Sequence, residues 1–213
     1  MSTDGATQSS GNPVTLVLDC ASGRTVCGVV RDGRELAFAS SEGGHAAQRA
    51  LALVDEVLAR AGYEIAALGG IVCGCGPGSF TGLRIGIATA RGLALGLALP
   101  CIGVSTLDAL AAGAPGAIAL IDARRGELFA LDAAGEPVAL LPADIAERLA
   151  PGTECVGDGA VRYRALLEAA GGVVPLDDDA RHAPGALALA GLARGASAEP
   201  VYVRRPDAEP RVA

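Results

Sequence analysis

The chain has 213 residues, of which 51% are apolar, and it carries a formal net charge of −7 with a sequence pI of about 4.8. All 17 basic residues are arginine, which excludes a Schiff-base lysine, a P-loop lysine and a kinase-type lysine. The acidic balance disfavours unaided binding to a nucleic-acid backbone, because such binding needs a basic stripe.

The opening of the chain predicts a polar leader followed by a three-stranded meander. Residues 1–13 are polar and lack the apolar stretch of a signal peptide, so we expect them to be disordered and the protein to be cytoplasmic. Apolar runs at 14–19, 25–31 and 34–40 predict strands. Asp32-Gly33 lies between the last two, and this pair is a strong hairpin signal because both turn positions need positive φ.

A helix, a buried strand and a second helix follow the meander. Apolar residues recur every three or four positions in 45–61, which predicts an amphipathic helix, and 68–75 is a wholly apolar strand of the kind that helices cover on both faces. The next helix, at 82–99, follows a Gly-Pro-Gly turn and can be capped by Ser79 or Thr81. Pro100 is predicted to end it.

The helix at 82–99 carries two lines of small residues with four-residue spacing. One line is Gly82, Gly86 and Ala90, and the other is Ala88, Gly92 and Gly96. Each glycine costs about 0.8 to 1 kcal/mol of helix propensity relative to alanine, so a compensating contact is expected. Either a second helix approaches closely, from this chain or another, or the glycines only seat the helix on its own sheet.

The second half restarts the pattern of the first. A short strand at 101–104 and a helix ending near 112 precede a Gly/Pro linker at 113–116. The strand, acid, glycine turn, strand and hairpin turn of the opening then recur with an offset of about 103 residues, so that Asp122 corresponds to Asp19. Shorter elements follow: helices near 142–149, 160–170 and 184–194, strands at 154–156 and 173–176, and an extended piece at 201–203.

The motif GPGSFTGLRIG at 76–86, followed by STLDALA at 105–111, closely resembles the TsaB family, also called YeaZ. Weaker echoes are IDARRGELFA at 121–130, VGDGA at 156–160 and PVYVR at 200–204. The resemblance implies an α/β, two-lobed fold of the actin, sugar kinase and Hsp70 type, a ribonuclease H-like duplication with a reduced second lobe. We expect a first lobe at 14–113, a smaller lobe at 114–205 and a flexible tail at 206–213.

In that superfamily ATP binds between the lobes, and an aspartate at the end of each lobe's first strand coordinates metal near the phosphates. Asp19 and Asp122 occupy those places, but neither is followed by the glycine that lets the backbone turn around phosphates. Free amides at Gly78, Ser79 and Thr81 form a further, weak anion candidate at a helix start. We therefore expect no cofactor bound by this chain on its own.

Other catalytic chemistry finds little support in the sequence. His45 and His182 are the only histidines, and neither has the second histidine that a paired-His metal helix requires. The six cysteines include no Cys-x-x-Cys pair, so we interpret them as small buried hydrophobes and expect neither a metal site nor a catalytic residue.

The resemblance implies a non-catalytic subunit that binds and activates a TsaD-type catalytic subunit. With a TsaE-type ATPase, that complex makes N6-threonylcarbamoyladenosine at position 37 of tRNA; ATP and tRNA act in the complex, no membrane is involved, and the free chain is expected to be a homodimer. Two alternatives stay open: an enzyme, either a small-molecule kinase or ATPase or a glycoprotease-like peptidase, and an autonomous tRNA-binding module. The predicted partner interface lies on the two first-lobe helices and comprises Ala47, Ala50, Leu51, Val54, Leu58, Gly82, Gly86 and Ala90.

Overall fold

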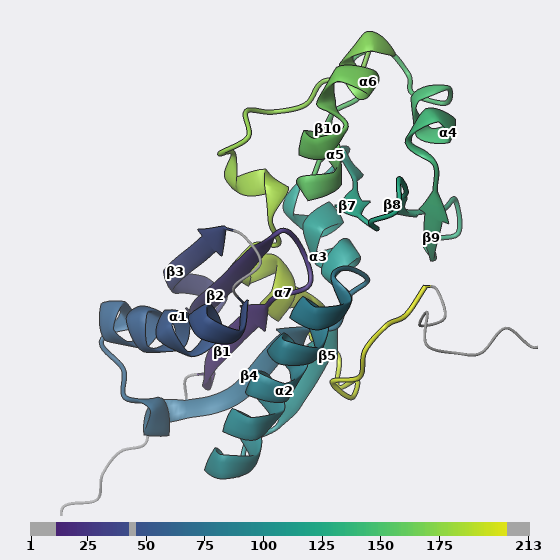
Figure 1. The fold of residues 1–213 in the computed structure, drawn as a ribbon. Helices are drawn as coiled ribbons and strands as arrows, with labels where there is room; N and C mark the ends of the chain where they lie inside the picture. The colour runs from purple at the N-terminus through teal and green to yellow at the C-terminus, as the bar shows by residue number, and fades with distance from the viewer. Residues whose placement is uncertain (1–11, 43–45, 204–213) are drawn as a thin grey trace, which may run out of the picture.

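The computed structural model describes residues 12–42 and 46–203, and a five-stranded mixed sheet organises its first half (Figure 1). Its strands are β1 (Val14–Asp19), β2 (Arg24–Arg31), β3 (Arg34–Glu42), β4 (Leu68–Gly74) and β5 (Cys101–Val104). The order is β3-β2-β1-β4-β5, with β1, β2 and β3 antiparallel and with β4 and β5 parallel to β1. The predicted meander and the wholly apolar strand predicted after it are confirmed.

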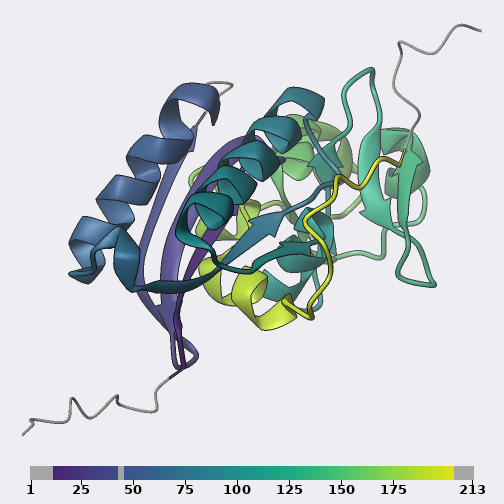
Figure 2. The same ribbon diagram turned by 90° about the horizontal axis from the view of Figure 1, so that it is seen from below.

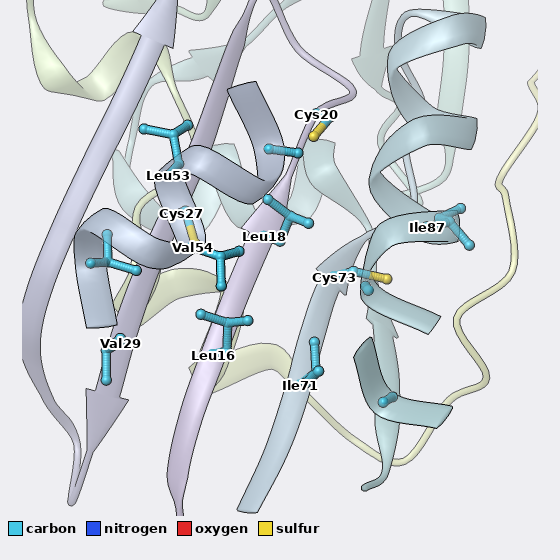
Figure 3. Packing of buried hydrophobic residues seen from close by; sticks show 14 of the residues in the cluster. Leu16, Leu18, Cys20, Cys27, Val29, Leu53, Val54, Ile71, Cys73 and Ile87 are labelled. Atoms are coloured by element: carbon cyan, nitrogen blue, oxygen red, sulfur yellow. The ribbon is translucent and has the colours of Figure 1, made fainter. Parts of the chain in front are cut away.

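Two long helices, α1 (Ala46–Ala61) and α2 (Phe80–Leu97), lie side by side on one face of this sheet (Figure 2). Leu16 and Leu18 of β1 and Leu53 of α1 pack in the core between the layers (Figure 3). Ser79, one of the two predicted capping residues, caps α2 by accepting a hydrogen bond from the amide of Gly82. The helix begins at Phe80, directly after its cap and two residues before the predicted start. It also ends two residues early, because Ala98 adopts a left-handed conformation with φ of 54° ahead of Pro100.

The opposite face is covered by α3 (Thr106–Gly113) and by α7 (Ala186–Leu192), which comes from the far end of the chain. Ala186 and Leu189 are fully buried there, and Gly28 of β2 leaves room for the Ala186 side chain, since a Cβ on Gly28 would lie 2.7 Å from it. The segment after α7 stays with the first half, because Gly103 of β5 donates its amide to Ala196. Residues 186–198 thus pack on the first sheet, although the sequence assigns them to the second lobe.

The second half repeats the first sheet in a shorter form. Its strands are β6 (Ile118–Ala119), β7 (Ile121–Asp122), β8 (Leu128–Leu131), β9 (Pro137–Leu140) and β10 (Cys155–Val156). Strands β7, β8 and β9 form an antiparallel meander like β1, β2 and β3, and β10 pairs parallel with β6 as β4 does with β1. The duplication predicted from the sequence is therefore present, with its first strand interrupted at Leu120.

Several predicted elements of the second half differ from the structure. The helix at 160–170 begins at Asp158 and is divided at Tyr163 into α5 (Asp158–Arg162) and α6 (Arg164–Ala169), while α4 (Pro142–Ala146) is shorter than predicted. The predicted strand at 173–176 is reduced to a single bridge between Glu154 and Val173. These elements are short and bury few side chains, so their apolar pattern gives weak local signals.

The remaining short elements are two single 3₁₀ turns, η1 (Ile65–Ala67) before β4 and η2 (Ala180–His182) before α7. The predicted extended piece at 201–203 forms no strand, but the amide of Val201 donates to the carbonyl of Cys75. Across 12–42 and 46–203, no helix is long and apolar enough to cross a membrane. Residues 1–11 of the leader, His45 and the tail at 206–213 lie outside the described residues.

Candidate functional site

Asp19, the first candidate metal and phosphate ligand, ends β1 and is fully buried. Its Oδ1 accepts a hydrogen bond from the amide of Ala21 at 2.8 Å, and its Oδ2 accepts one from the Thr106 hydroxyl at 2.5 Å. Burial raises the pKa of this carboxyl, an effect that the two hydrogen bonds oppose. Both carboxylate oxygens are thus engaged by the chain itself.

Thr106 extends this contact to the Gly-Pro-Gly turn. Its hydroxyl oxygen also accepts a hydrogen bond from the amide of Gly76 at 3.0 Å, so one side chain at the start of α3 connects the end of β1 with the turn before α2. Gly74 makes space for the carboxylate, since a Cβ on that residue would lie 1.5 Å from Oδ2 of Asp19. The arrangement fixes three first-half segments around one buried acid.

Asp122, the corresponding acid of the second half, has the same local role. Its Oδ1 accepts from the amide of Arg124, two residues later, just as Asp19 accepts from Ala21. Its Oδ2 accepts from a guanidinium nitrogen of Arg162 at 3.0 Å and lies 3.3 Å from one of Arg124. Each candidate aspartate is therefore held by residues of its own half, and neither presents a free oxygen pair to a metal ion.

The Gly-Pro-Gly turn packs against the loop that follows β1. A Cβ on Gly78 would lie 2.1 Å from the carbonyl oxygen of Ala21, and the amide of Ser79 donates to that same carbonyl at 2.7 Å. The hydroxyl of Ser79 is used to cap α2, whereas Thr81 is exposed. Of the three candidate anion-binding amides, that of Ser79 is thus used by a contact within the chain.

A pocket of about 330 Å³ lies between the two halves. The first half contributes Gly23, Arg24 and Glu42, and the second half contributes Asp158, Val161, Asp177 and His182. Arg24 donates to Glu42 at 3.0 Å and to the carbonyl of Asp177 at 2.7 Å. With three carboxylates and one arginine that is already paired, this wall is poorly suited to the phosphates of a nucleotide.

Asp158 was missed as a candidate residue, although it lies in the VGDGA motif. Its Oδ1 accepts from the amide of Asp122 at 3.2 Å, and its carboxylate contacts Gly23, where a Cβ would lie 2.9 Å from it. Burial, and secondarily the charge of Asp122, raise the pKa of Asp158 to about 6. One second-half carboxylate thus contacts the loop of the first half across the pocket.

The raised pKa makes a pH-dependent contribution to stability. The folded chain binds the proton of Asp158 more tightly than an unfolded chain with the ordinary value of 3.8, so this stabilisation is complete below about pH 4 and is lost as pH rises through about 6. We expect Asp158→Asn to raise the free energy of unfolding at pH 7 by about 1 to 2 kcal/mol. Urea unfolding of both proteins between pH 4.5 and 7.5 measures the difference, and parallel pH profiles would contradict it.

His182, which the sequence leaves without a role, is a structural residue of the same wall. It is buried, and the amide of Gly157 donates to its Nδ1 at 3.0 Å. Nε2 therefore carries the proton and faces the carbonyl of Pro175 at 3.2 Å. The ring connects three second-half segments and has no nitrogen available for acid–base catalysis.

The predicted partner interface is largely inside the protein. Ala50, Val54 and Leu58 of α1 belong to the core, as do the glycine positions of α2, where a Cβ on Gly82 would lie 2.1 Å from the carbonyl oxygen of Cys20. Six of the eight residues are buried, so the expectation that they present a surface was wrong: Ala50, Val54, Leu58, Gly82, Gly86 and Ala90. Leu51 is 54% exposed, and the side chain of Ala47 is outside the described part.

The second line of small residues on α2 does lie outside. Ala88, Gly92 and Gly96 are exposed, and a Cβ on either glycine would meet no described atom within 4 Å. Leu95, on the same stretch of helix, is 84% exposed. We use the name α1–α2 surface for the exposed residues Leu51 of α1 and Ala88, Gly92, Leu95 and Gly96 of α2, two helices that lie side by side (Figure 2).

The chain is similar in sequence to several known proteins. Residues 42–145, which include α1 and α2, match the family described as TsaD, tRNA N6-adenosine threonylcarbamoyltransferase. Escherichia coli K12 has a protein named tRNA threonylcarbamoyladenosine biosynthesis protein TsaB that is 50% identical over 88 residues, spanning 38% of this chain and 38% of that protein. An uncharacterized Mycobacterium tuberculosis H37Rv protein is 32% identical over 202 residues, 92% of this chain and 93% of its own.

Solved structures support the same relationship. A Pseudomonas aeruginosa protein described as similar to peptidase YEAZ has a TM-score of 0.70 at 30% identity, over 91% of this chain and all of that one. Component A of (R)-2-hydroxyglutaryl-CoA dehydratase from Acidaminococcus fermentans has a TM-score of 0.54 at 13% identity, over 85% and 98% of the two chains, which is a likeness of fold alone. The predicted fold class, a duplicated ribonuclease H-like fold of the actin type, is confirmed.

Proposed function

Because the chain belongs to the TsaB (YeaZ) family, we propose that it is the non-catalytic partner of a TsaD-type subunit in the synthesis of N6-threonylcarbamoyladenosine at position 37 of tRNA. The name of the E. coli relative gives the pathway. The match of residues 42–145 to the TsaD family supports the choice of a TsaD-type partner, since it indicates that TsaD-type proteins share this part of the fold.

The α1–α2 surface is the observation that carries the proposal. Gly92 and Gly96 each cost about 0.8 to 1 kcal/mol of helix propensity, and no contact within the described residues compensates for it. Side-chain-free positions on an exposed helix allow the backbone of another helix to approach closely, and the adjacent Leu95 supplies apolar area to bury. We therefore assign the docking of the partner to this surface.

Kinship between the two subunits suggests the geometry of the pair. Since the matched residues include α1 and α2, a TsaD-type partner is expected to carry equivalent helices, and the two proteins can pair about a pseudo-twofold axis. Two copies of this chain can use the same surface, which is the basis for proposing a homodimer when the partner is absent. The heterodimer and the homodimer then exclude each other.

The absence of independent activity is part of the proposal. The two candidate catalytic acids, Asp19 and Asp122, accept hydrogen bonds from their own halves, and the chain has no lysine for phosphate. Because this chain carries a net charge of −7, tRNA is proposed to bind through the assembled complex and not to this chain alone. In that complex a TsaE-type ATPase is proposed to use ATP. A cytoplasmic location stays a prediction.

The decisive experiment replaces Gly92 by leucine and measures affinity for the TsaD-type subunit of the same organism by calorimetry. Overpacking a close helix contact costs about 1 to 3 kcal/mol, so we expect the affinity to fall by about fivefold to 150-fold. Diluted to the monomer, the free chain is expected to unfold at slightly higher urea, because leucine is a better helix former than glycine by about 0.8 kcal/mol.

Gly191→Leu is the matched control, since Gly191 is also a helical, exposed glycine with an open Cβ position, but on α7 across the sheet. It should leave the affinity unchanged. Equal binding by the Gly92 and Gly191 variants would remove the α1–α2 surface from the proposal. ATP turnover by the isolated wild-type chain would contradict the non-catalytic role and favour the kinase alternative.

A further inference from the structure

Three of the six cysteines gather on the side of the sheet that α2 covers. Cys73 lies on β4, Cys75 follows that strand, and Cys101 begins β5; we name these three the thiol cluster. The sulfur atoms of Cys73 and Cys75 are 3.8 Å apart, and the thiols of Cys73 and Cys101 also interact. Figure 3 shows Cys73 on the sheet near Ile87 of α2.

The strand register explains why the thiols meet. In the parallel pair of β4 and β5, Cys101 is opposite Ile71, and Cys73 is opposite Gly103. Cys73, Cys101 and Gly103 therefore share one face, with Cys73 and Cys101 as diagonal neighbours. Gly103 has no side chain to separate them, and a Cβ there would lie 2.7 Å from the sulfur of Cys75.

Access distinguishes Cys101 from the other cysteines, whereas a lowered pKa is shared with the buried thiol of Cys75, which also interacts with Cys73. Cys101 is partly exposed, whereas the other five cysteines of the described residues are buried. Interaction with the thiol of Cys73, and secondarily the charge of Arg91 on α2, lower the pKa of Cys101 to about 7. The same contact raises the pKa of Cys73, and burial raises those of Cys20 and Cys27 to about 12.

We propose that the thiol cluster is a site of reversible oxidation by hydrogen peroxide, at which Cys101 reacts first and Cys73 then forms a disulfide with it. A solvent-accessible thiolate beside a second thiol is the arrangement that reacts in this way. The inference is independent of the proposed function, because it rests on the β4–β5 pair and not on any partner.

The chemistry balances with peroxide as the oxidant. The Cys101 thiolate attacks one peroxide oxygen, the O–O bond breaks, hydroxide leaves, and the sulfur becomes a sulfenic acid. The sulfur of Cys73 then attacks the sulfur of Cys101, the S–O bond breaks, and the departing hydroxide takes the thiol proton as water. Two thiols and one hydrogen peroxide thus give one disulfide and two waters, and a dithiol reductant such as dithiothreitol reverses the oxidation.

The test treats the full chain with hydrogen peroxide, blocks free thiols with N-ethylmaleimide and identifies linked peptides by mass spectrometry without reduction. We expect a link between Cys73 and Cys101 that dithiothreitol removes. In Cys73→Ala, the reaction should stop at a Cys101 sulfenic acid that dimedone traps. Cys155→Ser is the matched control, because Cys155 is a fully buried cysteine of the second half, and it should leave the link unchanged.

A second measurement follows alkylation of the wild-type chain by iodoacetamide as a function of pH, read peptide by peptide. The rate at Cys101 should rise with a midpoint near pH 7 and exceed that at Cys155 by at least tenfold. A link between Cys73 and Cys75 instead, or a Cys101 that reacts no faster than Cys155 while circular dichroism shows a folded chain, would overturn the proposal. The peroxide-induced link and the alkylation rates are both read on the wild-type protein, so neither result depends on the folding of a variant.

Discussion

Gly82→Ala is expected to destabilise the chain by about 2 to 4 kcal/mol, whereas Gly92→Ala, ten residues further along α2, is expected to stabilise it by about 0.5 to 1 kcal/mol. A Cβ on Gly82 would lie 2.1 Å from the backbone carbonyl oxygen of Cys20, so α2 must move away from the loop after β1. A backbone oxygen held between a strand and a turn cannot rotate aside as a flexible side chain can. At Gly92 the added methyl group meets no described atom of its own chain within 4 Å, so in the monomer only the gain in helix propensity remains.

Urea unfolding followed by circular dichroism measures both changes in one pair of proteins. Gly86→Ala gives an intermediate comparison, because a Cβ there would lie 3.1 Å from the Cβ of Cys20, a tight contact that a shift of a few tenths of an ångström relieves. A Gly82→Ala protein as stable as the wild type would show that α2 does not sit this close to the loop. A bulky residue at Gly86 or at Ala90, which is fully buried, therefore tests the fold and not the partner contact.

Thr106→Val is expected to lower the free energy of unfolding by about 3 to 5 kcal/mol, since it leaves one oxygen of a buried acid and a buried amide without their hydrogen-bond partner. The lost hydroxyl donates to Oδ2 of Asp19 at 2.5 Å and accepts from the amide of Gly76 at 3.0 Å. Valine keeps the shape of the side chain, so the loss reports the hydrogen bonds and not a cavity. Thr106→Ser keeps the hydroxyl and should cost much less.

The pH dependence of this loss separates it from a packing defect. The Thr106 hydroxyl lowers the pKa of Asp19 against the raising effect of burial, so its removal raises the folded-state pKa further. A carboxyl whose pKa is raised on folding destabilises the chain increasingly as pH increases. The loss in Thr106→Val should therefore be larger at pH 7 than at pH 4.5, and a loss that is the same at both pH values would contradict the assigned hydrogen bond.

Asp19 and Asp122, the two candidate metal ligands, both have their carboxylate oxygens hydrogen-bonded by the protein itself. The sequence correctly identifies Asp19 and Asp122 as repeats of one another, because both end a strand and precede a glycine turn by the same spacing. Their local hydrogen bonds, to Ala21 and Arg124, are also identical in form. In each case the side chain that donates a hydrogen bond to the second carboxylate oxygen is distant in the sequence. Thr106 is 87 residues from Asp19, and Arg162 is 40 residues from Asp122.

The helix α2 likewise shows that a sequence pattern alone does not decide which face of an element is buried. Two lines of small residues have the same four-residue spacing, so the pattern predicts two flat faces and cannot say which one meets the sheet. Contact with Cys20 and with the loop after β1 decides that Gly82, Gly86 and Ala90 lie inside. The exposed line of Ala88, Gly92 and Gly96 is then available for the proposed partner.

The sequence by itself determined the α/β class, the strands and long helices of the first half, the duplication and the family. Turn residues and apolar periodicity are local properties, and they are strong where elements are long. Only the tertiary structure decided that α7 covers the first sheet, which helix faces are exposed, and that Cys73 lies beside Cys101. Each of those outcomes depends on the packing of segments distant in the chain, and the free energy of such packing leaves no periodic trace in either segment alone.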